Sequence, residues 1–167
     1  KKYASERVQF GQTIDHLPPV KRILDDNEAY VHAMRALAYR SCEVVDHYDG
    51  LRKKFAQAGQ DEKAIRKIPE VVTLDRLAKL LTPTAKLFNS EMANFVAYHS
   101  LQIFGGSGYT EEFDIARIYR DARITTIYEG TTQLQAVAAI GSIVEGAREG
   151  GTLHSYITQE ISKLTAS

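Results

Sequence analysis

Apolar residues recur along the first part of the chain at the three- and four-residue spacing of a helix. They fall on one face of a long 3.6-residue pattern, which predicts a helix over about 19–48. Pro19 suits the first turn of such a helix, and Asn27 is the one polar interruption of the stripe. The stripe consists of Val20, Ile23, Leu24, Val31, Met34, Ala38, Cys42 and Val45.

A charged connection and a second long helix come next. The segment "RKKFAQAGQDEKAIRKIPEV" contains a glycine and a proline and predicts a flexible or charged excursion over 52–72. A helical stretch begins near Thr73, and Pro83 predicts a kink or a restart, with Thr82 as the N-cap. The glycines of "FGGSGY" (104–109) end this stretch.

Helical periodicity continues to the C-terminus. A short piece is expected around 112–119, a helix follows Gly130 and ends at "REGG" (148–151), and a last helix covers about 152–164. Strand-like alternation is absent. Helices joined by short turns predict an all-α fold, an antiparallel four-helix bundle in a single domain, 1–167.

The charge balance excludes partners that need a strongly basic or acidic surface. Lys and Arg together number 21, as do Asp and Glu, so the chain has no electrostatic footprint for nucleic acid or an anionic membrane. No apolar run approaches the roughly 20 residues that span a bilayer. Cys42 is the only cysteine, and we expect it to pack in the core of a protein from a reducing compartment. These features predict a soluble, intracellular protein.

Two common kinds of catalytic site have no counterpart in the sequence. The five histidines show no tight ligand spacing, so no metal site is predicted. Neither a GxSxG elbow nor a cysteine nucleophile with a partnered base is present, which argues against the usual hydrolases.

Two glycine-containing segments are candidates for ligand contacts. In "ERVQFG" (6–11), Arg7 could pair with phosphate oxygens and Gln9 with a polar ring edge, although the residues alone favour an exposed helix C-terminus with a favourable positive charge. In "FGGSGY", one glycine would be enough to end a helix, and three in four residues leave room for a ligand near the backbone. The segment is not a Rossmann loop, because no strand precedes it and the spacing differs.

The last candidates are "RIYRDARI" (117–124) and "YEGTTQLQ" (Tyr128–Gln135). Three arginines at three-residue spacing predict an ion-paired or solvated helix face. Glu129 stands between an aromatic ring and a glycine at a predicted helix start. It is either an acid that the helix macrodipole favours or a catalytic base, and the segment by itself leaves both readings open.

Three segments, in this order, resemble the C-terminal helical domain of the acyl-CoA dehydrogenases: "RVQFG", "LQIFGGSGY" and "RIYRDARITTIYEGTTQLQ". The match covers nearly the whole chain. The resemblance implies an FAD-dependent enzyme that oxidises an acyl-CoA to the 2,3-enoyl-CoA and passes the electrons to an electron-transfer flavoprotein. It also implies a homo-oligomer (dimer or tetramer) in the bacterial cytoplasm or the mitochondrial matrix. Family members carry two further domains, so we expect the chain to be a fragment that is inactive alone.

The resemblance also implies roles for individual residues. Glu129 becomes the base that removes the α-proton of the acyl group, and Tyr128 and Gly130 line the acyl-thioester site. That proton is only weakly acidic, so its base needs a dry, apolar pocket and a close approach to carbon. The residues implied in FAD binding are Arg7, Gln9, Phe10, Gln102, Gly105, Gly106, Thr131 and Gln133.

Alternatives remain open at this point. An acyl-CoA oxidase shares the base chemistry but passes electrons to oxygen, and a non-catalytic helical interaction module would keep the scaffold alone. Intact "FGG" and "GTTQ" segments argue against the module. Some family members place the base on an earlier helix. The excursion at 52–72 is typical of a subgroup with an enlarged C-terminal region, and "HLPPV" stands where many members carry a glutamine.

Overall fold

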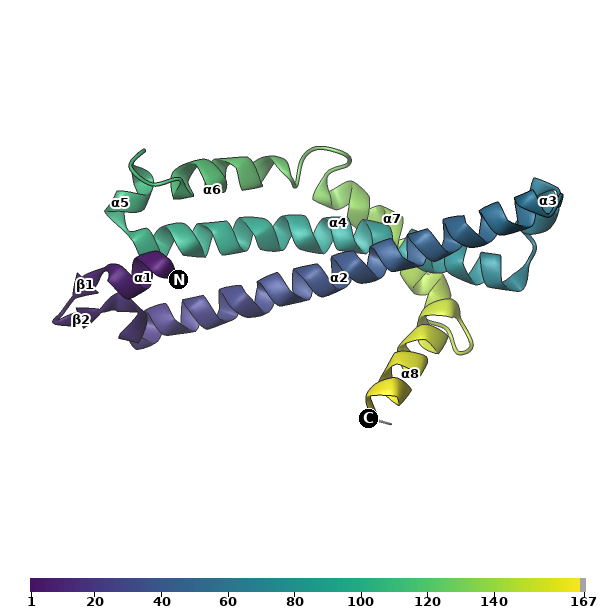
Figure 1. Cartoon of the computed structure of the whole chain (residues 1–167), viewed down its shortest axis with the longest axis horizontal. Coiled ribbons are helices and arrows are strands. Elements are labelled where there is room, and N and C mark those ends of the chain that lie inside the picture. Colours follow the sequence, from purple (N-terminus) through teal and green to yellow (C-terminus); the bar gives the residue numbers. More distant parts are fainter. Residues whose placement is uncertain (166–167) are drawn as a thin grey trace. The chain divides into compact units, whose positions relative to one another are not determined.

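The computed structural model describes residues 1–165 and is helical along most of that length (Figure 1). This confirms the all-α prediction. None of the helices within the described residues is long and apolar enough to cross a membrane. The helices are α1 Lys2–Glu6, α2 Pro18–Gln57, α3 Glu62–Ile65, α4 Pro69–Phe104, α5 Gly106–Tyr109, α6 Ile115–Ile124, α7 Thr132–Gly146 and α8 Thr152–Thr165.

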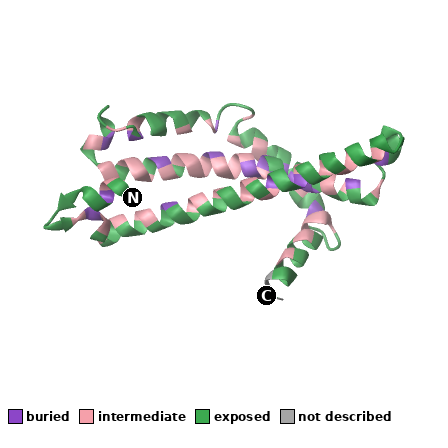
Figure 2. Cartoon of the chain, in the orientation of Figure 1, coloured by how far each residue is buried: buried purple, intermediate pink, exposed green. Residues whose placement is uncertain are grey.

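A small β-hairpin that the sequence pattern did not predict follows α1. Strand β1 (Val8–Gln9) pairs antiparallel with β2 (Gln12–Thr13), and a 3-10 helix, η1 (Ile14–His16), leads into α2. Each strand has two residues, which is too short to produce a recognisable alternation. The hairpin is mostly exposed (Figure 2).

Helix α2 is longer than predicted. The sequence pattern placed its end near 48, but the helix continues through Gly50 to Gln57. The added turns are rich in Leu, Arg, Lys, Ala and Gln, which are strong helix formers and outweigh the cost of about 1 kcal/mol for one interior glycine. Beyond it, Glu62 on α3 receives ion pairs from Arg52 at 2.5 Å and Arg66 at 2.9 Å. The flexibility of 52–72 stays a prediction.

Helix α4 continues through Pro83, so the predicted restart with Thr82 as an N-cap is wrong. A proline in a helix interior removes one backbone hydrogen bond and crowds the preceding turn. The side chains of Leu80, Leu81 and Ala85 around it are buried, and this packing holds the helix together. The helix also begins earlier than expected, at Pro69, where proline suits the first helical position.

Residues 1–36 and 87–132 form one compact unit. Its elements are α1, the hairpin, η1, the first half of α2, the second half of α4, α5 and α6. Three aromatic rings pack together in this unit: Tyr3 stacks on Phe104 at 4.0 Å between centroids, and Phe113 meets both rings edge-on. This cluster ties α1 to the end of α4.

Residues 37–86 and 133–165 form a second compact unit. Its core contains Val44 on α2 and Leu77 and Leu81 on α4, with Tyr156 of α8 packed against them. The prediction of a single domain stays a prediction.

Cys42 is exposed in the part of the chain that the structure describes, so the expectation that it packs in the core is wrong. The buried positions of this part of α2 are Ser41 and Val44. The face that packs is therefore rotated from the stripe read off the sequence, which passed through Cys42 and Val45.

Candidate functional site

A cavity of about 390 Å³ lies in the first unit, where α1, the hairpin, η1, the first turns of α2 and the end of α4 meet. Five of the eight residues predicted to bind a cofactor line it, although they come from two distant segments of the sequence. The remaining lining is largely apolar. These five residues are Arg7, Gln9, Gln102, Gly105 and Gly106.

Two backbone hydrogen bonds fix the position of Arg7 at the cavity. It is the C-cap of α1, where its N–H donates to the Tyr3 carbonyl at 2.9 Å, and its own carbonyl accepts from the Ile14 N–H at 2.9 Å. The backbone of Arg7 is thus held between α1 and the start of η1. Its positive charge also lies at a helix C-terminus, as the sequence alone suggested.

The hairpin tip presents Phe10. Both central residues of its two-residue turn, Phe10 at φ 52° and Gly11 at φ 80°, hold left-handed backbone, as the tight turns of hairpins require. The Phe10 side chain is 88% exposed and does not line the cavity. The turn therefore projects an aromatic ring beside Gln9.

The three glycines of "FGGSGY" do different work. Gly105 has φ 60° and ψ −143°, a conformation close to one that only glycine adopts readily. A Cβ at Gly105 or Gly106 would meet no atom within 4 Å, so both border open space. A Cβ at Gly108 would lie 2.6 Å from the Cβ of Phe104. Two glycines leave room at the cavity, and the third permits close packing.

The predicted base lies in the turn between α6 and α7, and its backbone is unusual. Glu129 has φ 51° and is followed by Gly130 at φ 88°. Left-handed backbone costs a non-glycine residue about 1–2 kcal/mol. Among residues 1–165 only Phe10 and Glu129 are non-glycine residues with positive φ, and both were predicted as site residues from the sequence. Strain of this kind clusters at functional sites.

Helix α4 holds both ends of this turn. The amide of Asn94 donates to the Ala122 carbonyl at the end of α6, at 2.9 Å. The hydroxyl of Thr132, the first residue of α7, donates to the carboxylate of Glu91 at 2.5 Å. Neither α4 residue was predicted from the sequence, where the only signal is two polar side chains three positions apart on a largely apolar helix.

The predicted base and the cavity that contains five of the predicted cofactor residues lie apart within the first unit. Helix α5, which lines the cavity, and the turn with Glu129 lie at opposite ends of α6 (Figure 1). Helix α6 has 10 residues and is therefore about 15 Å long. Tyr128 is half exposed beside Glu129, and Thr131 is exposed and does not line the cavity. Gln133 belongs to the second unit and is exposed.

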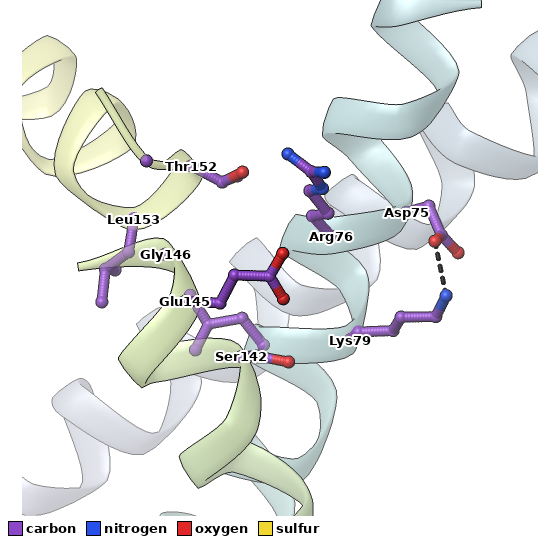
Figure 3. Close-up of a pocket in the computed structure, with 10 residues that line it drawn as sticks. Asp75, Arg76, Lys79, Ser142, Glu145, Gly146, Thr152 and Leu153 are labelled. Carbon is purple, nitrogen blue, oxygen red and sulfur yellow. Dashed lines mark hydrogen bonds and ion pairs between the residues drawn. The ribbon is translucent and has the colours of Figure 1, made fainter. Parts of the chain in front are cut away.

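A smaller cavity of about 250 Å³ lies in the second unit, between α4, the end of α7 and the start of α8 (Figure 3). Its lining contains charges of both signs: Lys79 pairs with Asp75 at 2.5 Å, and Arg76 and Glu145 stand on different walls. It contains none of the predicted site residues. Within residues 1–165 no group of three His, Cys, Asp or Glu side chains is arranged to hold a metal ion.

Comparisons with known proteins converge on one family. A family model described as "Acyl-CoA dehydrogenase, C-terminal domain" matches residues 1–142. Cyclohex-1-ene-1-carbonyl-CoA dehydrogenase of Geobacter metallireducens is 34% identical over 133 residues, which are 80% of this chain and 28% of that protein. The Caffeyl-CoA reductase-Etf complex subunit CarC of Acetobacterium woodii is 28% identical over 144 residues, 86% of this chain and 31% of that protein.

A solved structure of an acyl-CoA dehydrogenase is also similar to this chain. The crystal structure of an acyl-CoA dehydrogenase complexed with FAD from Bacillus anthracis matches with a TM-score of 0.67 and 26% identity, over 89% of this chain and 25% of that one. The chain thus spans less than a third of the length of each of these three proteins.

Proposed function

The chain belongs to the acyl-CoA dehydrogenase family, whose C-terminal domain it matches, and from this we propose that it is the C-terminal domain of a longer FAD-dependent acyl-CoA dehydrogenase with Glu129 as its base. The whole enzyme would oxidise an acyl-CoA to the 2,3-enoyl-CoA. The acyl-CoA substrate class is supported by the relatives, two of which are named as acting on CoA thioesters.

One observation carries the role of Glu129: its left-handed backbone. A glutamate that only capped a helix would hold the extended backbone typical of N-cap residues. Glu129 instead holds φ 51°, which glycine would adopt without strain, while still presenting a carboxylate. Retaining a charged side chain where backbone energetics favour glycine supports a chemical role.

The cavity in the first unit fits part of an FAD molecule. Arg7 supplies a cation for the pyrophosphate, and Gln9 and Gln102 supply amide groups for polar ring edges. Gly105 and Gly106 leave open space where the cofactor would approach the backbone. We propose that Phe10, Thr131 and Gln133, which do not line this cavity, contact FAD elsewhere in the assembled enzyme.

When bound, FAD supplies the acceptor for the hydride that leaves the acyl β-carbon. The carboxylate of Glu129 takes the α-proton, and the electron pair of that C–H bond becomes the new double bond. Ile127 and Tyr128 are half exposed beside it, so an acyl chain lying on them would exclude water from the carboxylate. Tyr128 and Gly130 would then line the thioester site.

We propose an electron-transfer flavoprotein as electron acceptor and a homo-oligomer as the working assembly. The first proposal is supported by the relative named as an Etf-complex subunit. The second is supported by a row of large apolar side chains on α7 that are more than half exposed, since such a row suits an interface. These are Leu134, Val137, Ile140 and Val144.

The substitution Glu129→Gln in the full-length enzyme tests this function. Glutamine keeps the size and hydrogen bonding but cannot accept the α-proton. We expect FAD content and acyl-CoA binding to persist, while flavin reduction on mixing with acyl-CoA slows by about 10²–10⁴-fold. Stopped-flow absorbance of the flavin measures this rate.

A matched control is Glu112→Gln, which changes an exposed carboxylate in the segment before α6. It should reduce flavin at the parent rate. If Glu129→Gln also reduces flavin at that rate, Glu129 is not the base. A loss of stability without a loss of rate would assign it to the helix terminus instead.

A further inference from the structure

We propose that Glu91 is a positioning residue for the base: from α4 it fixes the start of α7 and thereby the turn that presents Glu129. The inference rests on the proposed function, because it assigns a role to Glu91 only through Glu129. The observation that supports this role is a hydrogen bond of 2.5 Å, which the Thr132 hydroxyl donates to the Glu91 carboxylate.

The geometry gives the turn two fixed ends. Upstream, the Asn94 amide holds the Ala122 carbonyl at 2.9 Å, and the Thr125 hydroxyl donates to the same carbonyl at 2.6 Å. Downstream, Thr132 is held twice: its N–H donates to the Thr126 carbonyl at 3.1 Å, and its hydroxyl donates to Glu91. The residues between these anchors include Glu129.

The chemistry of the downstream anchor suits a carboxylate. An ionised carboxylate only accepts hydrogen bonds, so the Thr132 hydroxyl must donate to it, and such a charge-assisted bond is roughly twice as strong as a neutral one. Glu91 also places negative charge at the N-terminal end of α7, where the helix macrodipole favours it. The side chain is half-buried, which reduces screening by water.

The turn needs such anchors because its backbone is strained. The left-handed conformation of Glu129 persists only while the surrounding structure imposes it. Without the bond to Glu91, α7 can begin elsewhere, and Glu129 can relax to an ordinary conformation that moves its carboxylate. A displacement of about 1 Å at a reacting group can cost about 10²-fold in rate.

The test uses the full-length holoenzyme and separates positioning from general stability. Glu91→Ala removes the acceptor, and Thr132→Val removes the hydroxyl at nearly constant volume. We expect each to slow flavin reduction at saturating acyl-CoA by about 10- to 100-fold. The KM for acyl-CoA and the FAD content should stay near the parent values. The double variant should be no slower than the slower single variant, because both remove one bond.

Two further readouts distinguish a positioning role from a merely structural one. Glu91→Gln, whose amide oxygen can accept the same bond, should recover most of the rate. Hydrogen exchange of the backbone amides over 125–132 should be faster in Glu91→Ala than in the parent and unchanged in Glu112→Ala, an exposed control.

The outcomes separate this inference from the function on which it rests. Glu91→Ala and Thr132→Val at the parent rate, with Glu129→Gln inactive, would overturn the role of Glu91 alone. Glu129→Gln at the parent rate would overturn the proposed function. If Glu91→Ala fails to fold, the rate of flavin reduction in Thr132→Val decides the question. An equal loss of that rate in Glu91→Gln and Glu91→Ala also counts against positioning by this bond.

Discussion

At Glu129, side-chain chemistry and backbone preference conflict. The proposed reaction needs a carboxylate, whereas the left-handed backbone favours glycine. Phe10 shows the same conflict at the hairpin tip, where an exposed aromatic ring occupies a turn position suited to glycine or asparagine. Both positions retain a costly residue, which supports contacts that only those side chains provide.

This conflict predicts an inverted order of stability. At ordinary positions glycine is less stable than alanine by about 0.5–1 kcal/mol. At position 129 we expect Glu129→Gly to be more stable than Glu129→Ala by about 1 kcal/mol, because alanine keeps the left-handed strain and glycine does not. Urea unfolding of the two variants measures the difference. At Glu112, which has ordinary backbone, the alanine variant should be more stable than the glycine variant. If alanine is the more stable variant at both positions, the backbone of Glu129 is not strained.

Helix α8 lies beyond the residues that the family model matches, and one arginine connects it to α2 within the second unit. Arg40 donates to the Tyr156 hydroxyl at 2.8 Å and pairs with Glu160 at 3.2 Å and with Glu43 at 2.7 Å. Hydrogen bonds to Tyr156 and Glu43 raise the pKa of Arg40, so it stays charged. The attachment of α8 is therefore electrostatic in part.

The attachment should weaken in acid. The hydrogen bond from Arg40 lowers the pKa of Glu43 below its ordinary value of 4.5. The pKa of Glu160 is also lowered, mainly by the hydrogen bond from Lys163 and to a smaller extent by the charge of Arg40. Carboxylates with lowered pKa values stabilise the folded state above about pH 4.5, and that contribution is lost as the pH falls through the folded-state values. Arg40→Met should therefore lower the midpoint of thermal unfolding at pH 7, and its difference from the parent should shrink by pH 4.

Differential scanning calorimetry at the two pH values measures this effect. Arg22→Met is the control, because Arg22 lies on the same helix, is highly exposed and pairs only loosely with Asp26 at 3.8 Å. It should leave both midpoints unchanged. A difference between Arg40→Met and the parent that stays constant with pH would assign the role of Arg40 to packing alone.

On the scale of the whole molecule, the chain holds a fraction of the proposed site. It spans less than a third of the length of the relatives compared above, and its cavity of about 390 Å³ would hold only part of the proposed FAD. Glu129 and this cavity lie at opposite ends of α6. The working site therefore needs protein beyond these 167 residues.

The chain alone should consequently not bind FAD tightly. Few of the contacts would be made, and the entropy lost on association would outweigh them. Calorimetric titration of the isolated chain with FAD should show no stoichiometric uptake, while the full-length protein retains the cofactor through gel filtration. Stoichiometric, tight uptake by the isolated chain would show that its own residues complete the site.

Sequence patterns predicted what depends on local order along the chain. Helical periodicity located most of the long helices, and the motifs selected five candidate cofactor residues that the fold brings to one cavity. The catalytic role of Glu129 stays a prediction. Features that depend on non-local interactions could not be predicted from these patterns. The continuity of α4 through Pro83 depends on packing of its neighbours, and the bond between Glu91 and Thr132 joins residues 41 positions apart. The exposure of Cys42 depends on which face of α2 packs.

The left-handed conformation of Glu129 also has a genetic consequence. A single-nucleotide change turns either glutamate codon into a glycine codon, and glycine is the residue that this backbone prefers. In a duplicated gene whose product no longer needs the carboxylate, both the ease of this mutation and the gain in protein stability would favour glycine at position 129. We expect lineages that keep this scaffold for another purpose to lose the acid early, and to lose it to glycine more often than codon usage alone would produce.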